Sequence, residues 1–315
     1  MKVITDITAM KKEHEPIVLA AGFFDGVHKG HRKVLSTTIN KAKKISGKAW
    51  VLTFDNHPLK ILNPDIAPPL LTSNDHKIRL FDETKISGCL LLPFTRNMSR
   101  IKPEKFITQL KENIPNLKEI IIGRNWRFGS GAKGTAIMLS RLCKKEGIKV
   151  TIVDPVIRKG EPISSTRIRM QILKGNLAEA STLLGRPFSI YGTVVRGRKL
   201  ASTLGYPTAN IEPSNEVMPP YGVYAVIVFY NQKILDGVMN YGIRPTFPAS
   251  GKVKPVIEVF LLNFEGELYG KQIEVMFVEK LRDERKFASQ EELKKQIGMD
   301  VRLAKALLGH PVKNH

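Results

Sequence analysis

The sequence predicts two domains of different class: an α/β domain built on a parallel sheet, then an antiparallel β-barrel with a terminal helix. Over residues 1–184, apolar strand-like runs alternate with amphipathic helix-like runs, which is the pattern of parallel strands joined by crossover helices. Over residues 185–315, short β-rich runs follow one another and are separated by Gly, Pro and Asn. A length of 315 residues is the size expected for two domains.

The first domain is expected to contain five strands with helices between them. The strands are predicted at residues 17–21, 49–54, 89–92, 119–122 and 150–153, and the helices at 30–45, 75–86, 103–113 and 134–146. Ligands of such sheets bind beyond the carboxyl ends of the strands. The residues that directly follow each strand are therefore the first candidates for a site.

The second domain is expected to contain five barrel strands and one long helix. The strands are predicted at residues 190–195, 222–230, 233–239, 256–262 and 272–278. The helix is predicted over residues 289–308, with Ser289 as its N-cap and Glu292 as the partner of a capping box.

The composition narrows the classes of function. A net charge of +21 favours anionic ligands, but the Lys and Arg residues are scattered along the chain, so they indicate solvated helix faces and no specific nucleic acid. No run of about 18 apolar residues occurs, so no membrane association is expected. The first residues lack the apolar segment of a signal peptide, and Cys89 and Cys143 form no CxxC pattern. The chain is therefore expected in the cytoplasm with reduced thiols.

The segment Gly22–His31, GFFDGVHKGH, carries the most chemical information. It follows a predicted strand and opens a helix, whose first N–H groups form an anion site. Its glycines allow a tight turn and the close approach of a ligand. His28 and His31 are three residues apart, so both imidazoles can face one point and donate hydrogen bonds to phosphate oxygens. Two surface histidines or a metal pair would be the alternatives, but zinc needs further ligands, and the cysteines have no matching spacing.

This segment resembles the HxGH motif of the Rossmann-like nucleotidyltransferase superfamily. It is most similar to the adenylylating module of the prokaryotic bifunctional riboflavin kinase/FMN adenylyltransferase family, also called the FAD synthetase family. The resemblance covers essentially the whole chain. It implies that His28 and His31 are catalytic. It also implies ATP binding by Gly22, Phe24, Asp25 and Gly30.

Three further segments of the first domain resemble motifs of the same family. Residues 53–58, TFDNHP, imply that His57 and Pro58 bind flavin, and residues 123–129, GRNWRFG, imply that Asn125 binds nucleotide. Residues 163–169, ISSTRIR, imply contacts with the ATP phosphates from Ser165, Thr166 and Arg169.

Each of these segments also has a plain structural interpretation. Ser164 or Ser165 would serve as a helix cap, Asn125 as a turn residue, and Trp126 and Phe128 as core residues. The occurrence of all four motifs in this order, each downstream of a predicted strand, favours the functional interpretation.

The second domain resembles a riboflavin kinase. Residues 204–210, LGYPTAN, match its PTAN motif, and Thr208 and Asn210 at alternate positions of an extended chain face one side, where they suit Mg²⁺. Glu258 stands in an otherwise apolar run, and the resemblance implies that it is the kinase's general base; a strand glutamate that faces solvent is the alternative. The LRDERKF segment at 281–287 resembles a further segment of the family, which implies that Arg282 and Phe287 contact flavin or nucleotide.

Departures from the kinase pattern bear on this second activity. Ala201 and Ser202 stand where Gly and Arg are expected in a phosphate-binding loop, so backbone freedom and a phosphate partner are lost there. Phe260 stands where His is common, and Asn263 where Asp is common.

The expected function is therefore two-fold: ATP-dependent phosphorylation of riboflavin to FMN, and adenylylation of FMN to FAD with release of pyrophosphate. Mg²⁺ is the expected cofactor, with ATP, riboflavin and FMN as substrates. Three alternatives stay open: an adenylyltransferase with a weakened kinase domain, a flavin-sensing or nucleic-acid-binding regulator, and an HxGH enzyme acting on another phosphate. The sequence leaves the oligomeric state open.

Overall fold

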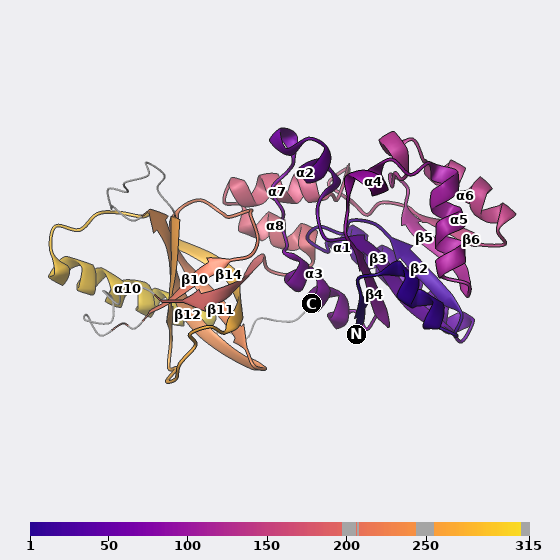
Figure 1. Ribbon diagram of the computed structural model, residues 1–315. Coiled ribbons are helices and arrows are strands. Elements are labelled where there is room, and N and C mark those ends of the chain that lie inside the picture. The colour runs from indigo at the N-terminus through magenta and orange to yellow at the C-terminus, as the bar shows by residue number, and fades with distance from the viewer. Residues whose placement is uncertain (197–205, 207, 244–254, 310–315) are drawn as a thin grey trace. The chain divides into compact units, whose positions relative to one another are not determined.

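The structure is a computed structural model that describes residues 1–196, 206, 208–243 and 255–309 (Figure 1). Contacts divide the chain into two compact units. Unit 1 comprises Met1–Leu70 and Asn74–Arg167, and unit 2 comprises Leu71–Ser73 and Ile168–His315. The division falls inside α7 (Ser165–Leu173), whereas the functional boundary at residues 184 and 185 falls at the end of α8 (Leu177–Leu184) and stays a prediction.

Unit 1 is built on a six-stranded parallel sheet in the order β1-β4-β3-β2-β5-β6. The strands are β1 (Lys2–Ile4), β2 (Ile17–Ala21), β3 (Lys48–Phe54), β4 (Gly88–Leu92), β5 (Leu117–Gly123) and β6 (Lys149–Val153). All five predicted strands are confirmed. The additional strand, β1, lies at the edge and pairs with β4 over three residues, too few to give a periodic pattern.

Alternate residues of the strands point to opposite faces of this sheet, and helices cover both faces. On one face Leu19 and Ile120 pack with α5 (Pro103–Asn113) and α6 (Ala136–Lys145). On the other, Val18 and Ile121 pack with α1 (Lys29–Lys44) and α3 (Asn74–Glu83). The four predicted helices are confirmed, with ends shifted by up to three residues.

Short elements lie mostly around the carboxyl edge of the sheet. They are α2 (Pro58–Leu62), α4 (Arg96–Ser99), the 3₁₀ turns η1 (Ile7–Lys12), η2 (Pro64–Ile66) and η3 (Ser130–Ala132), and a hairpin of β7 (Ile157–Arg158) and β8 (Glu161–Pro162). They are too short for a periodic pattern.

Unit 2 contains a closed antiparallel barrel in the order β10-β13-β12-β11-β14-β9. The strands are β9 (Ser189–Val195), β10 (Thr208–Pro213), β11 (Gly222–Tyr230), β12 (Lys233–Ile243), β13 (Pro255–Leu261) and β14 (Gln272–Arg282). The five predicted strands are present. The sixth strand, β10, begins within the PTAN segment.

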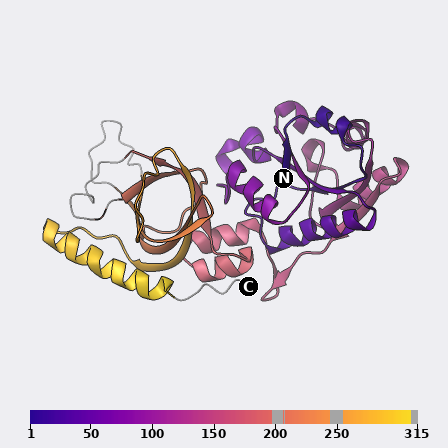
Figure 2. The same ribbon diagram turned by 90° about the horizontal axis from the view of Figure 1, so that it is seen from below.

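Helix α10 (Gln290–Leu308) lies along the outside of the barrel, as the view down the barrel axis shows (Figure 2). Ala304 and Leu308 pack against Val223 and Val238 of the barrel wall. Ser289 caps the helix by accepting from the Glu292 amide, as predicted. The capping-box prediction needs one correction, because the Glu292 carboxylate accepts from the Ala288 amide and not from that of Ser289.

Cys89 and Cys143 are both free and buried, and burial raises the pKa of each thiol to about 12. Among the residues described, no helix combines the length and apolar character needed to span a bilayer.

Candidate functional site

The loop between β2 and α1 has an unusual backbone. Phe24, Gly26 and Val27 have φ values of 58°, 80° and 40°, in the left-handed region that L-residues with side chains seldom adopt. Phe24 and Val27 are nonetheless buried, and the Phe24 ring packs edge-on against Phe81 of α3 at 5.7 Å. The surrounding core therefore holds this loop in a conformation that costs energy, as at many functional sites.

The two histidines of this loop lie against each other. Their rings stack with centroids 3.6 Å apart, and His28 is the N-cap of α1. The His28 Nδ1 accepts from the His31 amide at 3.3 Å. A neutral imidazole that accepts at Nδ1 carries its proton on Nε2, so that nitrogen can donate to an anion.

Gly30 lies close against the same stack. A Cβ at this position would lie 3.0 Å from Cε1 and 3.2 Å from Nδ1 of His28. The glycine between the two histidines therefore leaves room for the His28 ring.

A hydrogen bond joins the histidine loop to the ISSTRIR segment within unit 1. The Ser165 hydroxyl donates to the Asp25 carbonyl at 2.9 Å, across 140 residues of sequence. Ser164 caps α7 by accepting from the Arg167 amide at 3.3 Å. The sequence left open which serine caps the helix. In the structure Ser164 is the cap, and Ser165 contacts the histidine loop.

The other two phosphate candidates lie on the same helix. Thr166 is exposed, and Arg169 is buried one turn after Ser165. Arg169 lies in the part of α7 that belongs to unit 2, whereas Ser165 and Thr166 belong to unit 1.

The end of β3 lies beside the histidine loop. Thr53 donates its hydroxyl hydrogen to the Phe23 carbonyl at 2.9 Å, and the Phe23 ring meets the His57 ring edge-on at 4.9 Å. His57 caps α2 by accepting from the Leu59 amide, and Pro58 occupies the first helical position. Of the two predicted flavin residues, His57 thus contacts the histidine loop through Phe23, and Pro58 follows it at the start of α2.

The loop after β5 combines an exposed tip and a packed base. Asn125 is exposed in the turn that the Trp126 amide closes on the Gly123 carbonyl. The Trp126 and Phe128 rings stack 5.0 Å apart, and Phe128 belongs to the core. The plain structural interpretation therefore describes the two aromatic residues correctly.

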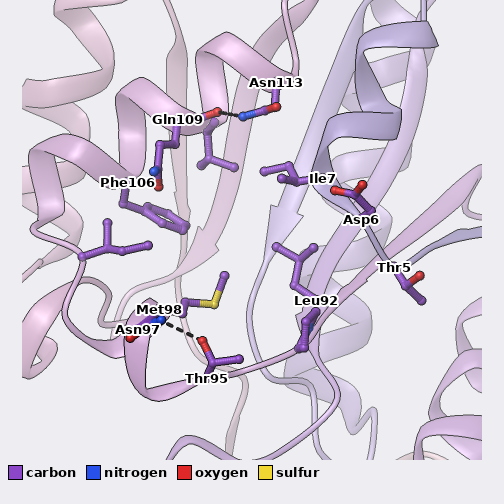
Figure 3. A pocket seen from close by; sticks show the side chains of 13 residues that line it. Thr5, Asp6, Ile7, Leu92, Thr95, Asn97, Met98, Phe106, Gln109 and Asn113 are labelled. Carbon is purple, nitrogen blue, oxygen red and sulfur yellow. Dashed lines mark hydrogen bonds between the residues drawn. The ribbon is translucent and has the colours of Figure 1, made fainter.

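A cavity of about 610 Å³ opens at the carboxyl ends of β1 and β4 (Figure 3). Its volume suits a small organic ligand. Its lining is apolar around Ile7, Leu92, Met98, Phe106 and Leu110, with polar groups from Asp6, Thr95, Asn97, Gln109 and Asn113. None of these residues was predicted. Thr95 lies just after the predicted strand at 89–92, which is the signal that could have identified it, whereas Asp6 follows β1, a strand that the sequence did not predict.

The barrel aligns three polar side chains across neighbouring strands. Glu258 of β13 pairs in register with Asn210 of β10 on one side and with Asn240 of β12 on the other. Directly paired residues point to the same face of a sheet. Thr208, two residues before Asn210, shares this face, as the alternation predicted. Asn240 is the member of this row that had no predicted role.

This row lies on the outer face of the barrel. Val238, two residues before Asn240 on β12, packs with Ala304 and Leu308 of α10, which lies outside the barrel. Asn210 is buried and Glu258 is half-buried.

A cavity of about 1320 Å³ adjoins Thr208 and Asn210. Phe260 and Asn263, the two departures from the kinase pattern, also line it. Asn263 has a φ of 55°, which Asn tolerates better than most residues. At its margin the Arg196 guanidinium stacks over the Tyr269 ring at 4.9 Å. The substituted loop with Ala201 and Ser202 lies outside the described residues.

The Arg282 guanidinium holds α10 in place. Its Nε and one terminal nitrogen donate to the Asp300 carboxylate at 2.9–3.1 Å, and Asp300 is buried. Gln296 donates to the same carboxylate at 2.8 Å. The Phe287 ring lies 5.6 Å from the guanidinium. The roles of Arg282 and Phe287 in flavin binding stay predictions.

Comparisons with known proteins assign the α/β part and the barrel part of the chain to two different family models. Residues 10–167 match the family model described as FAD synthetase, and residues 184–308 match the model described as riboflavin kinase. Relatives named bifunctional riboflavin kinase/FMN adenylyltransferase occur in Buchnera aphidicola (38% identity over 97% of this chain and 98% of the relative) and Escherichia coli K12 (36% over 98% of each). The relative of that name in Bacillus subtilis is 35% identical over 92% of each chain.

A solved structure shows the same fold over the full length. The crystal structure of a Streptococcus pneumoniae protein, described there as a macrolide-efflux protein, has a TM-score of 0.82 and 29% identity. It covers 97% of this chain and 99% of the other. Because two family models and full-length relatives agree, the chain belongs to the bifunctional riboflavin kinase/FMN adenylyltransferase family.

Proposed function

We infer that this chain makes both flavin cofactors: the barrel domain phosphorylates riboflavin to FMN, and the α/β domain adenylylates FMN to FAD. The observation that carries this inference is that the histidine loop and the ISSTRIR segment meet through Ser165 and Asp25. Two motifs assigned to ATP by resemblance thereby meet in one place. The matching family models and the names of the relatives support both activities.

In adenylyl transfer, an oxygen of the FMN phosphate attacks the α-phosphorus of ATP, and the bond to the β-phosphate oxygen breaks to release pyrophosphate. The stacked His28 and His31 are suited to donate hydrogen bonds to phosphate oxygens as their charge increases. The remaining ATP ligands of this proposal are Gly22, Phe24, Asp25, Gly30, Asn125, Ser165, Thr166 and Arg169. Catalysis then consists of positioning and charge neutralisation, without a covalent enzyme intermediate.

The cavity beside β1 and β4 is the proposed site of the flavin ring. Its volume of about 610 Å³ and its apolar walls suit a flat aromatic ring system, and the polar side chains supply partners for ring nitrogens and oxygens. His57 and Pro58, at the neighbouring end of β3, would then lie along the path of the flavin toward ATP.

In the kinase reaction, the terminal ribityl hydroxyl of riboflavin attacks the γ-phosphorus of ATP and ADP leaves. Glu258 is the proposed general base that takes the hydroxyl proton. ATP is proposed to occupy the cavity of about 1320 Å³ beside Thr208 and Asn210.

The residues present fit Mg²⁺ at the kinase site. Thr208 and Asn210 supply a hydroxyl and an amide oxygen from one face of β10, and Mg²⁺ prefers oxygen ligands together with substrate phosphates. When bound, Mg²⁺ would neutralise phosphate charge. In unit 1 no metal ligand is proposed, and no cluster of three or more His, Cys, Asp or Glu suited to a metal occurs among the described residues.

One assay tests the proposal. Purified protein is incubated with ATP and Mg²⁺, with either riboflavin or FMN, and the flavins are separated by chromatography. FMN and FAD formed from riboflavin would establish both activities in one chain. FAD formed from FMN, with riboflavin unchanged, would restrict the function to adenylyl transfer. The absence of both products would refute the proposal.

A further inference from the structure

Lys77 is a buried amine next to the adenylyl-transfer loops. It lies in α3, and its side chain and backbone together are 2% exposed. The Nζ atom donates to the Phe54 carbonyl at 2.8 Å and lies 4.6 Å above the centre of the Phe23 ring. One side chain therefore contacts both the histidine loop and the end of β3.

Asn74, one helical turn before Lys77, makes a parallel contact. Its side-chain amide donates to the Asp55 carbonyl at 2.9 Å. The first turn of α3 therefore binds the carbonyls of two consecutive residues, Phe54 and Asp55, at the point where β3 ends. These two residues begin the segment that leads to His57 and Pro58.

Burial disfavours the charged form of Lys77, and nearby acidic groups favour it. Burial lowers the pKa of this amine from 10.5 to about 8, while Asp25 of the histidine loop opposes that shift most strongly. Cys89 of β4 and Asp55 after β3 are the other ionisable groups that act on it. An apolar side chain of the same length would fill this space without that cost. An ammonium retained beside Asp25 therefore indicates a role for the charge.

We propose that Lys77 is a positioning residue for adenylyl transfer, which holds the loop of Phe23 and Asp25 and the segment of Phe54 to His57 in fixed relation. This proposal rests on the adenylyltransferase function proposed above. With 2% exposure the amine acts through these two segments and not by touching substrate. The two sets of side chains assigned to ATP and to FMN would thereby meet in a reactive geometry.

The test compares two variants of the full-length protein. Lys77→Met keeps the length of the side chain and removes its charge and donors, and Lys77→Arg keeps the charge. We expect Lys77→Met to lower kcat for FAD formation at least about tenfold, because misplaced reacting groups cost rate more than affinity. Lys77→Arg should recover part of that rate. FMN formation from riboflavin, measured on the same samples, should stay unchanged.

The pH profile separates positioning by charge from simple packing. As pH rises through about 8, the wild-type amine loses its proton, so the wild-type kcat for FAD formation should fall. In Lys77→Arg, whose guanidinium stays charged, that fall should be absent. This comparison requires only the wild type and Lys77→Arg. It therefore distinguishes positioning by charge from simple packing even if Lys77→Met does not fold.

The control is Lys118→Met, which changes an exposed lysine near the start of β5, the sheet edge opposite the loops. It should behave as wild type. A Lys77→Met enzyme with wild-type kcat and pH profile would overturn the proposal, and so would a folded variant that loses both activities equally. If the wild type itself makes no FAD from FMN, the proposed function fails and not this inference alone.

Discussion

The Ser165 hydroxyl lies 2.9 Å from the Asp25 carbonyl and joins the histidine loop to the start of α7. Ser164, its neighbour, makes only the capping contact with the Arg167 amide among the hydrogen bonds described for it. Because these two adjacent serines have different partners, the proposed functional role of Ser165 can be tested against the capping role of Ser164.

Ser165→Ala is expected to lower kcat/KM for FAD formation by about tenfold, since both the loop contact and the proposed phosphate donor are removed. FMN formation from riboflavin should be unaffected. Ser164→Ala is the matched control, and we expect it to cost about 1 kcal/mol of stability as a lost cap while FAD formation persists. Steady-state kinetics of both variants check this. An equal loss of FAD formation in both variants would contradict the distinction.

Gly30→Ala should displace the His28 ring, because the new Cβ would lie 3.0 Å from Cε1. We expect kcat for FAD formation to fall by about tenfold or more, as a small misplacement of reacting groups costs that much. The control is Gly298→Ala in α10, where the Cβ would meet only the Tyr206 hydroxyl at 3.5 Å. That variant should keep wild-type FAD formation and gain helix stability. Wild-type kinetics of Gly30→Ala would show that the ring has room to move.

The positions of these residues were largely predictable from sequence, because strand ends and glycines leave strong local patterns. Every predicted strand of the parallel sheet is present, and three of the motifs begin at or directly after the ends of β2, β3 and β5. The alternation of Thr208 and Asn210 likewise predicted their common face, since the period of a strand is two.

Lys77 and the cavity beside β1 could not be predicted in the same way. In the sequence Lys77 resembles any charged helix residue, and only its spacing of three and four from Leu80 and Phe81 places it on the buried face. The cavity depends on how β1, α4 and α5 come together, and β1 has three residues. The spacing of Lys77 thus indicates its burial but not its partners, and those partners, like the cavity, arise from tertiary packing.

Glu258→Gln tests the kinase site. Loss of the proposed general base should lower kcat for FMN formation by about 10²- to 10⁴-fold, while FAD formation from added FMN continues. Glu279→Gln on β14 is the matched control, because that glutamate is exposed on a barrel strand. Rapid-quench measurement of FMN formation gives the rate of the chemical step. A variant with wild-type kcat would remove Glu258 from the mechanism.

Asp300→Asn tests the anchor of α10. The substitution leaves the Arg282 guanidinium, 20% exposed, without its carboxylate, so we expect a loss of about 3 kcal/mol in stability. Thermal unfolding followed by circular dichroism measures the loss. The double variant with Arg282→Met should recover part of it, because no unpaired charge then remains. If the double variant were less stable than Asp300→Asn, the pair would not act as one unit.

Lys77 also predicts how the stability of unit 1 depends on pH. Its pKa is about 8 in the folded protein and 10.5 when unperturbed, so between these values the unfolded chain binds a proton that the folded chain does not. The contribution of Lys77 to the free energy of unfolding therefore rises as pH increases from about 8 to 10.5. Below pH 8 both states are protonated, and the full cost of the buried charge is present. The shift corresponds to roughly 3 kcal/mol across this window.

The measurement uses the two tryptophans, Trp50 and Trp126, which both lie in unit 1, so that their fluorescence follows its unfolding. Urea midpoints are determined for the wild type and Lys77→Met at several pH values through this window. The two proteins are compared because their other ionisable groups contribute equally, so that the difference in stability reports on Lys77. The wild type should gain stability relative to Lys77→Met as pH rises through the window. A constant difference would mean that the amine is not held at a lowered pKa. A decreasing difference would mean that the folded protein raises that pKa and stabilises the ammonium relative to the unfolded chain.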